Sequence, residues 1–437
     1  MVDLIRVRSL TVFGKWRPFF ISNKMSLLRI LDLENIENLF DHHLEQIGKL
    51  HHLQYLSLRG CMGIFRLPNS LGNLKQLQTL DIKQTMIRNL PKTIINLRKL
   101  QYIHAKIISW GDVSYKEMAS TFYEDLPRVL QNKACLLTLV SASFCVLCYA
   151  PQLIDIEEDD VIIDRRCLCT VFCCFMLPFI IRELQLYGIV LPRGFRKLRL
   201  LRTLTGVNIA FGKGILKEIK ALTQLRRLAV TGIDKKNCGE FCSTLADLRC
   251  LESLTVHSKP GLQGCLDGVS SPPKNLQSLK VSGNLVKLPE WIGGLNSLVK
   301  LKLHETMLSE LDATIQVLGK LPNLAILRLL KNSFKGEELN LTFHREAFPS
   351  LVVLQLACIS HDLRSVEFGE EATPKLELLS FIGYYPFAYK NAGMFSGLAS
   401  LPSLKEFMLD NAYAVEFLTD VQDQLDGNPN GPVMKRC

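Results

Sequence analysis

The chain has 437 residues, of which 48% are hydrophobic and 22% are charged, and its formal net charge is +10. This composition is that of a folded protein with an extended core, and it excludes an intrinsically disordered chain. A positive net charge favours acidic partners. However, Lys and Arg are spread over the whole chain without an arginine-rich block or a nucleic-acid-binding motif, so we expect no nucleic-acid partner.

The N-terminal stretch MVDLIRVRSLTV carries Asp3, Arg6 and Arg8, where a signal peptide needs an uninterrupted apolar run. We therefore expect a cytoplasmic protein. Peripheral attachment to the plasma membrane is an alternative for so basic a chain. In a reducing compartment the 14 cysteines stay as thiols, so we do not interpret them as a disulfide framework.

A short apolar phrase of the form L-x-x-L-x-L recurs along the chain. LQYLSLRGC begins at Leu53, LQTLDIKQT at Leu77 and LQYIHA at Leu100. An internal period of this length is typical of a solenoid. If Ile, Val, Phe or Gly is allowed at the apolar points, the phrase starts at Val7, Leu28, Leu53, Leu77, Leu100, Ile181, Leu201, Leu225, Leu251, Leu276, Leu298, Leu324, Leu351, Leu376 and Leu404.

Each phrase predicts one short strand, because its second and third apolar residues alternate with polar ones. The ladder of strands predicts that Leu56, Leu58, Leu80, Ile82, Leu279, Val281, Leu301 and Leu303 are buried. Leu-Pro steps such as Leu67-Pro68 and Leu288-Pro289 follow many phrases, and proline suits the corner that leads into a short helix.

One strand and its return segment cannot bury an apolar face alone, so the units must stack. We predict an α/β leucine-rich-repeat solenoid, or horseshoe, with a parallel concave sheet of about 15 short strands and short helices or irregular returns on the convex side. Polar residues after the third apolar position should bond to the backbone of the loops. These residues are Cys61, Thr85, Asn284, Thr306 and Asn332.

The repeat pattern is lost in the middle of the chain. Two stretches there, Ala134 to Ile154 and Cys167 to Ile181, carry no charge, and seven of the cysteines lie between 135 and 174. The first stretch is long enough to span a bilayer, but the repeat resumes at Ile181. We favour packing on the solenoid over integral membrane association. The predicted domains are N-terminal repeats (1–106), an irregular Cys-rich insertion (107–180), and C-terminal repeats with a cap (181–437).

Motifs of catalysis and metal binding are absent from the sequence or incomplete. Cys145, Cys148, Cys167 and Cys169 approach the spacing of a zinc ribbon, but the first two lie in an apolar run without the glycines of a metal knuckle. The sequence has no G-x-x-x-x-G-K-[ST] phosphate loop, no H-E-x-x-H, no G-x-S-x-G and no kinase motifs. We therefore predict no enzyme, no catalytic residue, no cofactor and no metal.

Longer stretches of the repeats carry a family resemblance. LPNSLGNLKQLQTLDIKQT, LPRGFRKLRLLRTL, LKEIKALTQLRRLAVTGI and the terminal GLASLPSLKEFMLDNAYAVEFL occur in this order. They resemble the repeat region of cereal-type plant disease-resistance proteins, the coiled-coil class of nucleotide-binding leucine-rich-repeat receptors. Complete receptors carry a nucleotide-binding switch domain before the repeats, and this sequence lacks its phosphate loop. We expect a detached repeat domain, a truncated paralogue or a partial gene model that does not bind nucleotide itself.

The resemblance implies a role in innate immunity, with a pathogen effector or a guarded host protein bound on the concave face. It also implies, as a further partner, the nucleotide-binding domain of a related receptor supplied by a second chain. A non-immune intracellular scaffold and a non-functional truncated paralogue are the alternatives.

The alternation of the phrases assigns residues to the concave face. The residues expected to point outward are Arg29, Asp32, Glu34, Tyr55, Ser57, Arg59, Thr79, Asp81, Lys83, Arg227, Ala229, Thr231, Lys280, Ser282, Lys300, Lys302, His304, Ile326, Arg328 and Leu330. Tyr and Arg dominate binding hot spots, which favours Tyr55, Arg59 and Arg328. The candidate partner-binding residues are Tyr55, Arg59, Lys83, Arg227, Lys302, His304 and Arg328.

Overall fold

The computed structural model describes residues 4–17, 21–22, 24–105, 188–212, 214–258, 261–336, 338–358, 363–383, 393–409 and 413–436. The chain divides into two compact units, Met1–Lys106 with Gly188–Cys437, and Ile107–Tyr187. All described residues belong to the first unit. The predicted insertion at 107–180, its two apolar stretches and the repeat phrase at Ile181 lie outside the described residues.

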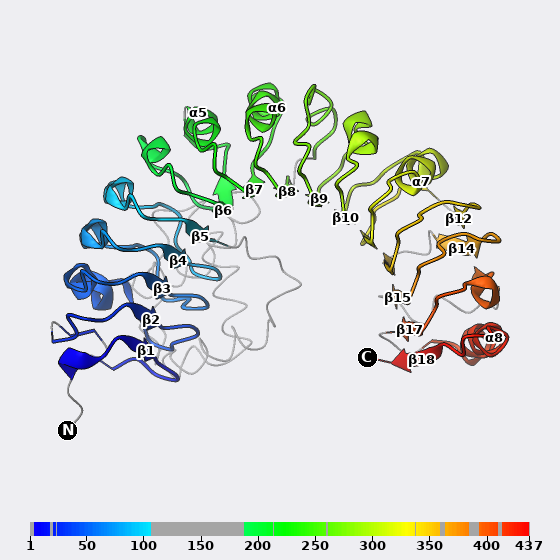
Figure 1. Ribbon diagram of the computed structural model, residues 1–437, viewed down its shortest axis with the longest axis horizontal. Coiled ribbons are helices and arrows are strands. Elements are labelled where there is room, and N and C mark those ends of the chain that lie inside the picture. Colours follow the sequence, from blue (N-terminus) through cyan, green and yellow to red (C-terminus); the bar gives the residue numbers. More distant parts are fainter. Residues whose placement is uncertain are drawn as a thin grey trace, which may run out of the picture. The chain divides into compact units, whose positions relative to one another are not determined.

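Fifteen short parallel strands form one sheet, in which each strand is hydrogen-bonded to its neighbours in chain order (Figure 1). The strands of this sheet are β1 (Ser9–Thr11), β2 (Ile30–Asp32), β3 (Tyr55–Ser57), β4 (Thr79–Asp81), β5 (Tyr102–His104), β6 (Thr203–Asn208), β7 (Arg227–Thr231), β8 (Ser253–His257), β9 (Ser278–Ser282), β10 (Lys300–His304), β11 (Ile326–Leu330), β13 (Val353–Cys358), β15 (Leu378–Gly383), β17 (Glu406–Leu409) and β18 (Val433–Arg436). The predicted parallel sheet of a leucine-rich-repeat solenoid is confirmed.

One strand of the sheet was not predicted. This strand is β18, which pairs with β17 and is the fifteenth strand of the sheet. It was not predicted because the stretch from Val433 to Arg436 lacks the L-x-x-L-x-L phrase. In the middle of the sheet, β5 is hydrogen-bonded directly to β6, with Tyr102 opposite Thr203. Thus the sheet is continuous across the gap in the described sequence between residues 105 and 188.

The return segments lie on one side of this sheet (Figure 1). They contain the helices α5 (Ile215–Lys220), α6 (Cys238–Asp247), α7 (Leu311–Gly319) and α8 (Val415–Asp426), and the 3-10 helices η3 (Asp41–Lys49), η4 (Asn69–Asn73), η5 (Lys92–Asn96), η8 (Phe195–Lys197), η9 (Glu290–Gly294) and η11 (Leu398–Ser400), while η1 (Leu4–Arg6) precedes the first strand. Pro68, Pro91 and Pro289 stand immediately before η4, η5 and η9, as the Leu-Pro steps predicted.

The core between the sheet and the return segments is built mainly from leucine. All eight residues that the alternation placed inside are buried, and Leu80 and its register partners Leu56 and Ile103 are each 0% exposed. Because successive side chains of a strand point to opposite faces, burying one set leaves the other set on the second face of the sheet. We call that second face, opposite the return segments, the open face.

Polar side chains after the third apolar position bond to the backbone, as predicted, at three places. Cys61 donates its thiol to the carbonyl of Leu33 (2.9 Å), Thr85 donates to Ile82 (2.8 Å) and Thr306 donates to Ser333 (2.9 Å). The prediction was wrong at Asn284, which is exposed.

In the coil after β11 the structure assigns this function to Ser333 and not to Asn332. The hydroxyl of Ser333 is 2.7 Å from the carbonyl oxygen of Leu330 and 3.1 Å from that of Leu303. Lys331 and Asn332 both have a positive φ, so the chain turns one residue later than the spacing predicted.

A second parallel sheet of three strands, which the sequence did not predict, covers the return side of the C-terminal coils. It consists of β12 (Leu339–Phe343), β14 (Leu363–Phe368) and β16 (Phe395–Ser396). Phenylalanine fills the space between the two sheets: Phe343 stacks on Phe368 with ring centroids 4.9 Å apart, and Phe395 meets Phe407 edge-on at 5.2 Å. These large side chains keep the two sheets apart where leucine alone would leave voids.

Candidate protein-binding face

The open face near the N-terminus carries Tyr55 on β3, and Arg59 and Lys83 just beyond β3 and β4. The Arg59 Nε atom lies 3.4 Å from a carboxylate oxygen of Glu34 in the preceding coil, and Lys83 Nζ lies 3.6 Å from Asp81. Burial raises the pKa of Tyr55, so its phenol is neutral at pH 7. The two candidate cations in this region, Arg59 and Lys83, thus each form an ion pair with a carboxylate of the protein itself.

One residue predicted to point outward is out of register, and three others have the outward strand position but are buried. β2 pairs with β3 so that Ile30 lies opposite Tyr55. The outward-facing residue is therefore Ile30, which is 42% exposed. The predicted residue, Arg29, lies one position earlier in the chain. Ser57, Asp81 and Thr231 are buried. Ser57 and Asp81 are short, and their oxygens accept hydrogen bonds from the backbone N–H two residues on, at Arg59 (3.5 Å) and Lys83 (3.0 Å).

A row of three cations crosses the open face at β9, β10 and β11. Lys280 is the register partner of Lys302, and Lys302 is the register partner of Arg328. Neighbouring strands lie about 4.8 Å apart, so these side chains are adjacent. Lys300 at the start of β10 is exposed beside this row. We call Lys280, Lys302 and Arg328 the basic row.

His304 follows Lys302 by two positions on β10, so it lies on the same face of the strand, and it is half-buried. Its Nδ1 atom is 3.1 Å from the Ser282 hydroxyl and 3.9 Å from a carboxylate oxygen of Glu305. Burial lowers the pKa of His304, and the charges of Lys302 and Lys331 add to this effect while Glu305 opposes it. At pH 7 the imidazole is therefore neutral, and His304 offers a hydrogen bond and not a charge.

Apolar side chains continue the open face on the C-terminal side of the basic row. They are half-buried and come from four neighbouring strands, β11, β13, β15 and β17. We call this set the apolar patch, which consists of Ile326, Leu330, Val353, Leu378, Ile382 and Met408. Ile326 and Leu330 flank Arg328 on the same strand, so the basic row and the apolar patch form one continuous surface.

The structure therefore brings together three of the seven candidate residues. Lys302, His304 and Arg328 lie on two adjacent strands. Arg227 lies on β7, opposite Ser253 of β8 and apart from the basic row, and Tyr55, Arg59 and Lys83 lie farther along the sheet, around β3 and β4. Sequence reasoning did not include Lys280 among the candidates, nor most of the apolar patch. The sequence does indicate the apolar patch, because β11, β13 and β15 have apolar residues at outward-facing positions as well as at inward-facing ones.

Among the described residues, no group of three or more His, Cys, Asp or Glu side chains is placed to hold a metal ion. No described helix combines the length and the apolar character that crossing a lipid bilayer requires.

Comparison with known proteins agrees with this architecture. The model of the family described as "Leucine-rich repeat region" matches residues 6–136 and 181–432. The leucine-rich-repeat protein LIC12759 of Leptospira interrogans has a similar structure, with a TM-score of 0.50 and 17% sequence identity over 98% of this chain and 90% of that one. At this level of identity the similarity shows the fold alone.

Two curated rice proteins (Oryza sativa subsp. japonica) are similar in sequence. Disease resistance protein Pik-2 is 25% identical over 446 residues, which cover 96% of this chain and 38% of Pik-2. Disease resistance protein RGA4 is 35% identical over 134 residues, which cover 30% of this chain and 13% of RGA4. The chain thus corresponds to little more than a third of the length of Pik-2. It belongs to the leucine-rich-repeat family, and its repeats are similar to those of the plant disease-resistance proteins Pik-2 and RGA4.

Proposed function

We propose that the chain is a protein-recognition module of plant innate immunity, and not an enzyme, and that it binds a pathogen effector or a guarded host protein on the open face. The observation that carries the proposal is the basic row beside the apolar patch. Such a surface is complementary to a protein segment in which acidic residues adjoin exposed apolar ones.

The arrangement of charges supports this assignment. Lys280, Lys302 and Arg328 are consecutive register partners, and like charges opposite one another on neighbouring strands destabilise a sheet. An acidic partner would remove that repulsion, while the apolar patch would gain from being withdrawn from water. Arg328 is exposed in the middle of the surface and is the expected anchor.

Two features of this proposal rest on similarity to the resistance proteins. The nucleotide-binding domain of a related receptor would be a further partner. The protein would function in the cytoplasm, with peripheral membrane attachment as the alternative. A non-immune scaffold would use the same open face, but with partners that do not depend on infection.

The test compares proteins captured by the chain from infected and uninfected plant tissue. The wild type is compared with the double variant Lys302→Gln/Arg328→Gln and with a control, Arg345→Gln/Arg364→Gln. The control removes the same charge from two exposed ion pairs, Arg345–Glu371 and Arg364–Glu338. We expect partners that appear only on infection, are lost with the first variant and are kept with the second.

Partners captured equally from both tissues would favour the scaffold. A partner set that both variants retain would contradict binding through the basic row. Absence of any specific partner in either tissue would agree with a non-functional paralogue.

A further inference from the structure

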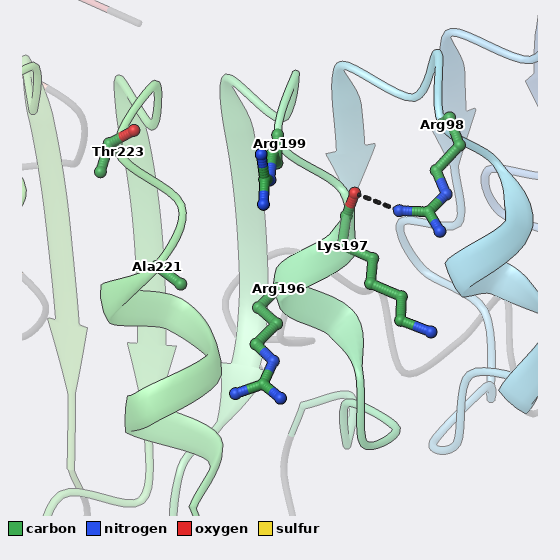
Figure 2. A pocket seen from close by; sticks show the side chains of 6 residues that line it. All are labelled: Arg98, Arg196, Lys197, Arg199, Ala221 and Thr223. Atoms are coloured by element: carbon green, nitrogen blue, oxygen red, sulfur yellow. Dashed lines mark hydrogen bonds between the residues drawn. The ribbon is translucent and has the colours of Figure 1, made fainter.

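A hollow of about 670 Å³ opens beside η8, away from the basic row (Figure 2). The residues that line it are Arg98, Arg196, Lys197, Arg199, Ala221 and Thr223. They come from the three coils that lead into β5, β6 and β7. Arg196 and Lys197 belong to η8, and the other four residues lie between a return helix and the strand that follows it. The volume lies within the range of small-molecule sites, about 300 to 1,000 Å³.

Four of the six lining residues are cations, and all four are exposed. Arg196, Lys197 and Arg199 fan out from a single turn, and Arg98 reaches toward them from the neighbouring coil (Figure 2). The Nη1 atom of Arg98 donates a hydrogen bond to the carbonyl of Lys197 (3.0 Å), which fixes this guanidinium at the rim.

The nearby carboxylate of Glu218 does not pair with these side chains. Its two oxygens accept the backbone N–H groups of Gly194 (3.1 Å) and Arg196 (2.8 Å), at the start of η8. Among the described residues, no carboxylate lies within ion-pair distance of the Arg196, Lys197 or Arg199 side chain. Within the described part of the chain, these three cations therefore have no carboxylate that neutralises them.

Two cations of the neighbouring coil, in contrast, are paired with carboxylates. In the next coil Lys220 Nζ lies 2.8 Å from Asp247, and Arg226 Nη1 lies 2.6 Å from Glu252, each a carboxylate one coil further on. Ion pairs between coils recur toward the C-terminus, as at Lys405 and Glu377 (2.9 Å). Concentrated like charge destabilises a folded protein, and a bound anion would neutralise the four cations gathered around this hollow.

We infer that the hollow binds a small molecule that carries several phosphate groups, either free in solution or as the headgroup of a lipid. Guanidinium groups bind phosphate oxygens through two parallel hydrogen bonds, and the hollow is lined by three of them with one ammonium. The lining includes no large apolar side chain that would hold a peptide residue. This site is separate from the open face and does not depend on the function proposed above.

The test is calorimetric titration of the full chain with inositol hexakisphosphate as the probe. The triple variant Arg196→Gln/Lys197→Gln/Arg199→Gln should bind about tenfold more weakly or worse, because each lost contact is a charge-assisted hydrogen bond. The control Arg345→Gln/Arg364→Gln/Lys405→Gln removes the same charge from ion-paired positions and should stay within about twofold of the wild type. Thermal unfolding of each variant checks that it is folded. If the triple variant is not, single variants at Lys197 and Arg199 replace it.

Vesicles then identify the source of the phosphates. Binding to phosphatidylcholine vesicles that contain a phosphoinositide bisphosphate, and not to vesicles of equal charge made with phosphatidylserine, supports a lipid headgroup. Binding of the soluble probe without vesicle binding supports a free ligand. The inference is overturned if the probe does not bind at low salt, or if the triple variant and the control are weakened equally. Tighter binding of a polyglutamate peptide or an oligonucleotide of the same charge also overturns it.

Discussion

Lys302 of β10 and Arg328 of β11 are register partners, so two positive side chains lie next to each other on the open face. Lys280 of β9 extends the row on the other side of Lys302. Stability alone does not favour this arrangement, since like charges directly opposite destabilise paired strands. A binding surface commonly carries such a cost in the free protein.

Replacing Arg328 by Gln should therefore stabilise the free protein while it weakens partner binding. Relief of the repulsion from Lys302 should raise the free energy of unfolding by up to about 1 kcal/mol. Urea denaturation of the wild type and the variant measures this difference. The control Arg345→Gln breaks an exposed ion pair with Glu371 and should not stabilise. Equal effects of both substitutions would show that the basic row carries no repulsion.

Replacing Leu80 by Ala should destabilise the solenoid by about 2 to 5 kcal/mol. The Leu80 side chain is 0% exposed and lies between Leu56 and Ile103 of the neighbouring strands, so its truncation leaves a cavity that the stacked coils cannot close. Denaturant titration is the measurement. Thr79→Ala, on the open face of the same strand, should cost less than about 1 kcal/mol. A change below about half a kcal/mol at Leu80 would contradict its assignment to the core.

Gly283 and Gly294 should respond differently to alanine. Gly283 follows β9 with φ +122°, and a Cβ atom there would collide with the carbonyl oxygen of Ser258 in the preceding coil. Gly283→Ala should therefore lower the free energy of unfolding by about 1 to 3 kcal/mol or more. Gly294, at the end of η9, has open space where a Cβ atom would lie and no positive φ, so Gly294→Ala should be neutral or slightly stabilising. Similar melting temperatures for the two variants would contradict this backbone geometry.

His304 should make the stability depend on pH below about 6.5. Burial lowers the pKa of His304 below its ordinary value of 6.5, so the unfolded chain takes up a proton before the folded chain does. This contribution is fully present above pH 6.5 and is lost as the pH falls through the lower, folded pKa. The free energy of unfolding should consequently decrease as the pH falls below about 6.5.

His304→Gln should reduce that decrease without abolishing it, because burial also lowers the pKa of His104 and of His43. Glu305 affects this comparison little, since its pKa lies below its ordinary value of 4.5. Substitution of His51, which is exposed, is the control and should follow the wild type. Parallel pH profiles for all three proteins would show that His304 is not coupled to folding.

The N-terminal half of the sheet shows which features the local sequence pattern can predict and which it cannot. The alternation of LQYLSL and LQTLDI was enough to identify Leu56, Leu58, Leu80 and Ile82 as core, because the direction of a side chain within a strand depends only on its position in that strand. The same pattern could not place Arg29. Its position relative to Tyr55 depends on which residues of β2 and β3 are hydrogen-bonded to each other, and that pairing puts Ile30 there.

The sequence by itself determined the fold, the identity of most inward-facing residues and the family resemblance, since all three depend on a short pattern that repeats along the chain. Tertiary structure decided which charges are neighbours. Lys280, Lys302 and Arg328 form a row because coils of unequal length bring them into register, and Arg98 meets Lys197 across 99 positions of sequence because β5 pairs directly with β6. The second sheet also depends on tertiary structure, because β12 and β14 can pair only when their coils are stacked and Phe343 packs on Phe368. Contacts between coils depend on hydrogen-bond register and loop length together, and the repeating phrase encodes neither.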